Sequence, residues 1–424
     1  MPPQFSDHRQ HIDHLVKAVL RAADPALAIE RAWQSDHTDT FQLIGIGKAA
    51  LRMALHLNHI APSQISGGIV TAAPVDLQSV PTQLPFEVWP ALHPLPDERN
   101  EAASRAILQL AEQAGPQDEL VVLISGGGSA HLTLPLPSLT LDQLARLYQD
   151  LMRAGLDIQA LNTVRQQCER LKGGGLAQAI APAQAQVYIL SDVVGDDLQF
   201  IASGPTVRPQ TTAHHALDIL KEAGLVAVHP EIADHLGRRA AEGEALYEAF
   251  NHVTNHLIGS NTLALNALER EAETMGFTIA GKQHDVTGEA RDVGRALAQR
   301  AELLCMEAVR PLVYLIGGET TVTVAGTGLG GRNQEVALAA AIELAGQEKV
   351  ALFSFATDGR DGPTDAAGAV VTGQSVQQAA ERGVDLSACL RNNDSYRCLS
   401  ALGALIQTGL TGTNVNDVAA LLVY

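Results

Sequence analysis

The chain has 424 residues, 46% of them hydrophobic, and its 47 acidic and 29 basic side chains give a formal net charge of −18. This length exceeds the usual single-domain range, so we expect two domains, each with a sizeable core. The negative charge argues against nucleic acid or an anionic membrane as a main partner. It also makes the few cations informative, because an acidic protein that handles an anionic substrate must concentrate positive potential locally.

Cysteine usage and hydropathy give expectations about redox state and compartment. The four cysteines are scattered without a CxxC pair, which predicts reduced thiols and no zinc site. No apolar run approaches the roughly 18 residues that span a membrane, and the N-terminus lacks the basic and apolar regions of a signal peptide. We therefore expect a cytoplasmic protein with no membrane partner, and a homodimer is among the assemblies we expect.

The first half of the chain alternates short apolar strands with helices. The predicted strands cover 41–46, 65–71, 120–124 and 187–190, and the predicted helices cover 9–22, 49–57, 102–114 and 141–154. Thr140 is a plausible N-cap for the last of these helices. This alternation predicts an α/β domain with a Rossmann-like, doubly wound parallel sheet that has helices on both faces.

The second half begins after a charged stretch, 228–250, that reads as helical and has no strand signal. We place the boundary there, which gives domains 1–245 and 246–424. A second alternation follows, with predicted strands over 252–258, 312–316 and 350–356 and predicted helices over 263–275, 288–308 and 333–345. The β-rich run 320–324 closely follows a strand and is expected to pair with it antiparallel. The second domain is therefore predicted to be α/β with a mixed sheet.

A glycine-rich segment after a buried strand is the strongest chemical signal. The apolar run 120–124 leads into Ser125-Gly126-Gly127-Gly128-Ser129, where bare backbone can turn its N–H groups toward an anion between two hydroxyls. The related segment Lys172-Gly173-Gly174 adds a lysine beside glycines. We assign both segments to phosphate or nucleotide binding. A close-packed turn between sheet and helix is the alternative.

The segment Gly45-Ile46-Gly47-Lys48-Ala49-Ala50 fits the dinucleotide fingerprint G-x-G-x-x-A. That fingerprint needs a carboxylate about 20 residues further on to bind the ribose hydroxyls. The next predicted strand runs into Ala72-Ala73-Pro74, and no carboxylate appears before Asp76. A nicotinamide site therefore lacks its confirming residue. We place Gly47 at a phosphate and Lys48 against a phosphate oxygen, with a tight turn and a solvated lysine as the alternative.

Aspartates gather after two predicted strands, with Asp192, Asp196 and Asp197 after the first and Asp358, Asp361 and Asp365 after the second. Carboxylates at strand ends suit Mg²⁺, which takes one or two protein oxygens plus waters and substrate phosphates. The candidate magnesium ligands are Asp192, Asp197, Asp358 and Asp361. Loop aspartates are also ordinary turn formers, so a purely structural role is the alternative for each.

Polar residues of the second half complete the candidate site. Arg332 follows two glycines at a predicted helix start, where it could stabilise charge on a transferring phosphoryl group. A surface arginine is the alternative. Candidate groups for substrate binding or for the second-domain side of the site are Ser260, Asn261, Glu319 and Asn333.

Taken in chain order, these motifs resemble the type 2 glycerate kinase family, whose members were historically described as hydroxypyruvate reductases and carry a C-terminal MOFRL module. Each matching segment is modest alone, but the series is specific and covers nearly the whole chain. The segments are Gly47-Lys48-Ala49-Ala50, His93-Pro94-Leu95-Pro96-Asp97-Glu98, Ser125–Ala130, Leu171–Ala177, Ser191–Asp196, Ser203–Thr206, Gly317–Val322, Gly330–Glu335, Thr357–Asp365 and Thr411–Val415.

The resemblance implies transfer of the γ-phosphoryl group of ATP to the 2-hydroxyl of D-glycerate, with Mg²⁺, giving 2-phosphoglycerate and ADP. It also implies two α/β domains with the active site in the cleft between them. Lys48 and Arg332 match the candidate catalytic lysine and arginine of the family. His131, where a small or aliphatic residue is expected, and Leu410, where proline is usual, depart from the pattern and put local packing in doubt. An NAD(P)H-dependent hydroxypyruvate reductase is the alternative function, and a non-catalytic nucleotide sensor is a further one.

Overall fold

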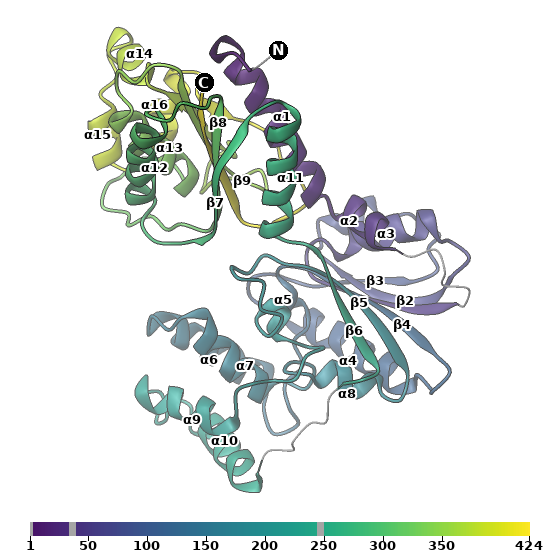
Figure 1. The fold of residues 1–424 in the computed structure, drawn as a ribbon. Coiled ribbons are helices and arrows are strands. Elements are labelled where there is room, and N and C mark those ends of the chain that lie inside the picture. Colours follow the sequence, from purple (N-terminus) through teal and green to yellow (C-terminus); the bar gives the residue numbers. More distant parts are fainter. Residues whose placement is uncertain (1–2, 34–39, 244–249) are drawn as a thin grey trace. The chain divides into compact units, whose positions relative to one another are not determined.

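The computed structural model of the protein describes residues 3–33, 40–243 and 250–424. The chain divides into two compact units (Figure 1). The central unit is Ala28–Ile258, and the terminal unit combines Met1–Leu27 with Gly259–Tyr424. The predicted boundary at 245/246 lies outside the described residues, and a linear division into 1–245 and 246–424 does not include the return of the N-terminal segment to the C-terminal half.

The central unit contains a six-stranded sheet in the order β3-β2-β1-β4-β5-β6. Neighbouring strands from β3 through β5 run parallel, which confirms the predicted parallel sheet. The inner strand β4 is buried at every position after Glu119, and burial on both faces explains why its sequence is a continuous apolar run. The strands are β1 (Phe41–Ile46), β2 (Ile65–Ala72), β3 (Glu87–Pro90), β4 (Glu119–Ile124), β5 (Gln184–Leu190) and β6 (Val253–Gly259).

The strand β6 was predicted to begin the second sheet, and this is wrong. It lies beside β5 at the edge of the first sheet, and the amide of Ala185 donates to the carbonyl of His252 at 2.8 Å. Nothing in the sequence of 252–258 shows whether this strand is the last of the first sheet or the first of the second sheet. The order of strands in space is needed to assign it.

Helices of the central unit cover the sheet and form a separate helical cluster (Figure 1). In that cluster Leu144, Leu147 and Leu220 are fully buried. The predicted cap is confirmed, because the Thr140 hydroxyl accepts from the Gln143 amide in a capping box. The helices are α2 (Pro25–Ala32), α3 (Ala50–Ile60), α4 (Glu98–Gln113), α5 (Gly128–His131), α6 (Leu141–Arg153), α7 (Ile158–Cys168), α8 (Gly175–Ile180), α9 (Ala213–Glu222) and α10 (Pro230–Glu242).

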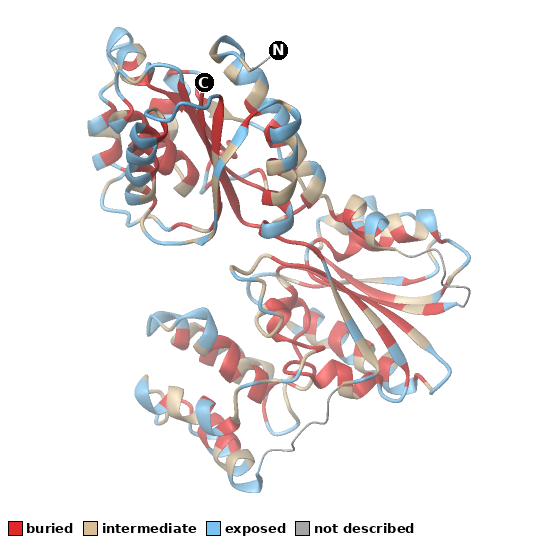
Figure 2. Cartoon of the chain, viewed as in Figure 1, coloured by how far each residue is buried: buried red, intermediate tan, exposed pale blue. Residues whose placement is uncertain are grey.

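The terminal unit contains a second six-stranded sheet in the order β11-β10-β9-β12-β8-β7. The β7–β8 pair is parallel and the other pairs are antiparallel, so the predicted mixed sheet is confirmed. Figure 2 shows that the strands of both sheets carry much of the buried core. The strands are β7 (Thr278–Val286), β8 (Leu312–Gly318), β9 (Val350–Ala356), β10 (Gly368–Thr372), β11 (Leu405–Ile406) and β12 (Asp417–Val423).

The predicted antiparallel strand over 320–324 is wrong. Strand β8 is already paired on both edges, with β7 on one side and β12 on the other. Within the run, Thr321 forms only an isolated parallel bridge to Glu289. The fully buried strand β12, far away in the sequence, takes the position that a local hairpin would need.

Two groups of helices flank this second sheet (Figure 1). Helix α1 packs on α11, and α12 packs on α13. The contact of α1 explains why the N-terminal segment belongs to this unit, and the His11 ring bonds to the Tyr424 hydroxyl at 3.0 Å. The helices are α1 (His8–Ala23), α11 (Asn261–Thr274), α12 (Ala290–Leu304), α13 (Arg332–Glu343), α14 (Ser375–Glu381), α15 (Leu386–Arg391) and α16 (Ser395–Ala401).

The prediction that all four thiols are reduced is corrected by the structure. Cys389 on α15 and Cys398 on α16 form a disulfide, with their Cα atoms 6.5 Å apart. Cys168 and Cys305 are free. None of the described helices is both long enough and apolar enough to cross a membrane.

Candidate functional site

The loop Ser125–Ser129 joins β4 to the single-turn helix α5 in the central unit. Gly127 adopts a left-handed conformation with φ of +79°, and a Cβ atom placed on it would lie 2.8 Å from Cε of Lys48. Any residue with a side chain is therefore strained at this position. The backbone N–H groups of Gly126 and Gly127 make no hydrogen bond within the described residues. Two free amides at a strand end are suited to an anion.

Gly47 and Lys48, which the sequence analysis assigns to a phosphate, lie against this loop. The Lys48 amide donates to the Gly126 carbonyl at 3.0 Å, and the Ala49 amide donates to Ser125 Oγ at 3.0 Å. Strands β1 and β4 are parallel neighbours with Ile46 opposite Ile124, so the segments after them meet at one edge of the sheet. The Lys48 side chain is exposed. A cation and free amides are thus brought together.

Asp192 adds a carboxylate to the same edge, just after β5. A Cβ atom on Gly126 would collide with the Asp192 carboxylate, so the side chain lies directly over the loop. Desolvation raises the pKa of Asp192, and the positive charge of Lys48 opposes this change. A partly desolvated carboxylate beside a phosphate-binding loop can serve Mg²⁺ as one of its few protein ligands.

The other predicted magnesium ligands bond to nearby backbone. Asp197 accepts from the Gln199 amide and Asp358 accepts from the Arg360 amide, each at 2.9 Å. Asp361 is buried and accepts from the amides of Asn333 and Gln334, so it caps α13. Over 3–33, 40–243 and 250–424, no group of three or more His, Cys, Asp or Glu side chains could hold a metal ion by itself. Asp192 is the aspartate that we keep as a magnesium ligand.

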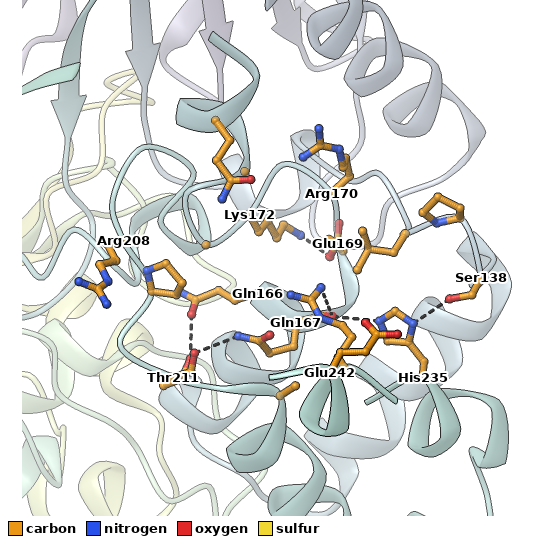
Figure 3. A pocket seen from close by; sticks show the side chains of 18 of the residues that line it. Ser138, Gln166, Gln167, Glu169, Arg170, Lys172, Arg208, Thr211, His235 and Glu242 are labelled. Atoms are coloured by element: carbon orange, nitrogen blue, oxygen red, sulfur yellow. Dashed lines mark hydrogen bonds and ion pairs between the residues drawn. The ribbon is translucent and has the colours of Figure 1, made fainter. Parts of the chain in front are cut away.

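The second glycine-rich segment is engaged inside the protein. Lys172 Nζ lies 2.5 Å from Glu169 Oε1, and both side chains are buried (Figure 3). Burial lowers the pKa of Lys172 to about 8, against the effect of Glu169. The amides of Gly173 and Gly174 donate to the carbonyls of Ser203 and Gly204 at 3.0 and 2.7 Å. The candidate phosphate site therefore leaves out Lys172, Gly173 and Gly174.

These residues border a polar cavity of about 500 Å³ in the central unit (Figure 3). His235 points to Ser138, with Nδ1 2.7 Å from the serine hydroxyl, and its Nε2 lies 3.2 Å from the Gln167 carbonyl. Arg239 also donates to the Gln167 carbonyl, at 3.2 Å. Several polar groups of this wall therefore bond to one another, whereas Nε2 of Gln178 in the same wall has no hydrogen-bond partner among the described residues.

A smaller cavity, of about 360 Å³, opens beside the loop Ser125–Ser129, and we call it the loop cavity. Gly127, Ser129 and Asp192 contribute to its wall. His93, Asn162 and Arg165 also line it, and sequence reasoning gave none of the three a role. His93 belongs to a segment that carries the family resemblance, but that segment has no pattern that identifies a ligand.

Arg332 is held in the terminal unit by two carboxylates. Its Nε and Nη2 donate to the two oxygens of Asp417 at 2.5 and 2.9 Å, and its Nη1 donates to Glu319 at 2.8 Å. Although burial opposes it, Asp417 raises the pKa of Arg332. Burial raises the pKa of Asp417, against the effect of Arg332. The guanidinium is therefore fixed, charged and partly exposed. Asp417, the first residue of β12, was missed because that strand was not predicted.

The remaining predicted residues of the terminal unit have structural partners. Asn261 Nδ2 donates to the carbonyls of Val415 and Asp417, both at 2.9 Å, and it is buried. Ser260 caps α11 through the Leu263 amide. The Asn333 side chain accepts from the Ser354 hydroxyl. Glu319 and Asn261 thus lie with Arg332 around the start of β12, whereas Ser260 acts as a helix cap.

Comparisons with known proteins cover both units. The family model described as "Domain of unknown function (DUF4147)" matches residues 11–237, and the MOFRL family model matches residues 312–417. The chain is 36% identical to the D-glycerate 2-kinase of Thermotoga maritima over 416 residues, 95% of each chain. It is 38% identical to the glycerate kinase of Homo sapiens over 436 residues, covering 89% of this chain and 83% of the human one. The crystal structure of Thermotoga maritima glycerate kinase matches with a TM-score of 0.91 and 35% identity, over 99% of this chain and 100% of that one.

Proposed function

Because the chain belongs to the glycerate kinase family, we propose that it is an ATP-dependent glycerate 2-kinase. It transfers the γ-phosphoryl group of ATP to the 2-hydroxyl of D-glycerate and releases 2-phosphoglycerate and ADP. The observation that carries this proposal is the loop Ser125–Ser129, whose free amides at Gly126 and Gly127 lie beside the exposed cation Lys48. The extensive similarity to named glycerate kinases supports the same activity.

In this proposal catalysis depends on positioning and electrostatics, because phosphoryl transfer asks little covalent work of the protein. The amides of Gly126 and Gly127 donate to phosphate oxygens, and Lys48 neutralises their charge. Asp192 is the residue that would hold Mg²⁺, which offsets charge on the phosphates when bound. In the terminal unit, Arg332 has a planar guanidinium that Asp417 and Glu319 already orient, and this group is suited to bind a carboxylate or a phosphoryl group.

Two observations weigh against the reductase alternative. No carboxylate stands at the end of β2, where a dinucleotide-binding fold holds the ribose, because the strand ends at Ala72 and continues with Ala73 and Pro74. In addition, Gly47 is packed against Ser125, with the position of a Cβ atom blocked by the serine carbonyl. The space that a side chain at position 47 would fill is therefore occupied by Ser125 of the same chain. The glycine is explained by this contact, so it does not indicate a bound pyrophosphate.

A paired assay tests the proposed function. The purified protein is incubated with D-glycerate, ATP and Mg²⁺ while ADP release is followed, and separately with hydroxypyruvate and NADH or NADPH while nicotinamide oxidation is followed. We expect ADP release that requires glycerate and no oxidation of either nicotinamide. Oxidation without ADP release would establish the reductase, and nucleotide binding without turnover of either substrate would establish a sensor.

A further inference from the structure

The loop cavity has an apolar side that glycerate cannot use. Leu95, Met152 and Ile158 line it, and these side chains are 48%, 47% and 55% exposed. Glycerate has three carbons, and each carries oxygen, so it gains little from apolar walls. A cavity that combines apolar side chains with a few placed polar groups is typical of a site for a larger organic ligand, and about 360 Å³ is large enough for one.

A buried donor without a partner lies in the wall of the same cavity. Asn162 is 1% exposed, and its Oδ1 accepts from the Ser203 hydroxyl at 2.7 Å. The Ser203 hydroxyl also lies 2.9 Å from the Ser129 hydroxyl, and Nδ2 of Asn162 has no hydrogen-bond partner among the described residues. A buried donor that stays unpaired is costly, so its presence at a cavity points to an acceptor on a ligand. The ring nitrogens of a purine are acceptors of this kind.

The backbone that holds Asn162 in place is itself unusual. Ala202 and Ser203 both adopt left-handed conformations, with φ of +51° and +61°, although neither is glycine. A Cβ atom on Gly128 would meet the Ala202 side chain, so the strained segment is packed tightly against the loop Ser125–Ser129. Such conformations persist where surrounding structure imposes them, and they concentrate at binding sites. The fixed segment keeps the Ser203 hydroxyl on the Asn162 amide.

The polar side of the cavity continues to the candidate phosphate site. Gly127 and Ser129 belong both to the cavity wall and to the loop with free amides. Arg165 lies over the Tyr148 ring at 4.9 Å from its centroid, which holds a cation on this wall. One ligand can therefore place an anionic group on the loop and an apolar, planar group against Leu95, Met152 and Ile158.

We propose that the loop cavity binds the adenosine moiety of ATP, with the base against these apolar side chains and the triphosphate directed to the loop and Lys48. The proposal rests on the proposed function and deepens it, because it assigns nucleotide binding to the central unit. The Asn162 amide, whose Nδ2 has no partner among the described residues, lies in the wall of the cavity that takes the base.

Titration calorimetry with apolar-to-polar variants tests this assignment. Ile158→Gln alone and Met152→Gln with Ile158→Gln change exposed side chains, so the fold should be kept. Val228→Gln is the matched control, because Val228 is 58% exposed in the same unit and does not line the cavity. Each protein is titrated with ATP and with inorganic tripolyphosphate in the presence of Mg²⁺, and KM for glycerate is measured.

We expect Ile158→Gln to weaken ATP binding about fivefold, the effect of losing roughly 40 Å² of apolar contact, and the double variant about 20-fold. Tripolyphosphate affinity, KM for glycerate and the Val228→Gln control should stay unchanged. Unchanged ATP affinity in the double variant would overturn the proposal. If the double variant kept its ATP affinity and had a raised KM for glycerate, the cavity would be assigned to glycerate. The proposed function fails separately, if the unmodified protein does not phosphorylate glycerate.

Discussion

The central unit contains two glycine-rich segments, Ser125–Ser129 and Lys172–Gly175, that share a sequence pattern and differ in their partners. Both follow buried residues, both contain left-handed glycines, and both have a lysine nearby. In the first, the amides of Gly126 and Gly127 are free and Lys48 is exposed. In the second, the amides of Gly173 and Gly174 and the ammonium of Lys172 are all bonded within the protein.

The comparison teaches that a glycine cluster marks a close approach of the backbone without saying what approaches. In the second segment the approaching groups are the carbonyls of Ser203 and Gly204, so the glycines hold the fold together. In the first segment they are the side chains of Lys48 and Asp192, and the backbone amides remain available. The hydrogen-bond satisfaction of the loop decides between a structural and a functional assignment.

Lys172→Met should give the largest effect of the variants considered, a decrease in the stability of the fold. The change leaves Glu169 buried without its cation, and losing one partner of a buried pair costs about 3–5 kcal/mol. We expect a matching decrease in the free energy of unfolding by urea, with kcat nearly unchanged in the fraction that stays folded. A stable variant with a large loss of kcat would place Lys172 at the phosphates.

His131 behind the first loop should make stability depend on pH. It is fully buried and hydrogen-bonded to Thr71, and burial lowers its pKa to about 4 from 6.5. Between these values the unfolded chain binds the proton and the folded protein does not, so stability falls as pH decreases from about 6.5 to about 4. The total is about 3 kcal/mol, at 1.36 kcal/mol for each pKa unit.

Replacement by leucine separates this titration from that of other groups. Urea unfolding of the unmodified protein and of His131→Leu at pH 7 and at pH 4.5 measures the difference. The variant should lose less stability between the two conditions. Equal losses would show that the ring is protonated in the folded protein or that it is not buried.

Lys48→Met should reduce turnover and leave stability unchanged. The side chain is exposed, and methionine keeps its apolar stem while removing one preorganised cation. We expect kcat to fall about 100-fold or more, the scale for one electrostatic contact to a transition state. Steady-state kinetics with D-glycerate and thermal unfolding of the same preparation measure both quantities. Near-normal turnover would make Lys48 a surface residue.

Gly127→Ala should have a smaller effect, on nucleotide affinity. An added Cβ would meet Lys48 Cε, the movable end of a flexible side chain, and alanine is strained at a φ of +79°. We expect about tenfold weaker ATP binding by calorimetry, with a modest loss of stability. Gly174→Ala is the matched control, because its Cβ would meet the Phe250 ring and the Val207 carbonyl. That variant should lose stability and keep its ATP affinity.

The part of the site that could be predicted is the part that follows from strand order. The approach of Lys48 to the Ser125–Ser129 loop follows from two parallel strands whose ends lie at one edge of a sheet, and both strands are continuous apolar runs. The bonding of the second segment inside the protein could not be predicted from the sequence. The Lys172 ammonium pairs with Glu169. The amides of Gly173 and Gly174 bond to the carbonyls of Ser203 and Gly204, which come later in the chain. Asp417 was missed for a related reason. The run 418–423 is apolar, but its place between β8 and β9 depends on the order of strands in space.

Hydrogen–deuterium exchange of the whole protein with and without saturating ATP and Mg²⁺ tests the central claim most directly. The claim is that the amides of the first glycine loop bind phosphate and those of the second do not. We predict slower exchange in peptides that contain residues 125–129 and unchanged exchange in peptides that contain residues 172–176. Protection of the second loop in place of the first, or protection of neither in a protein saturated with ATP, would contradict it.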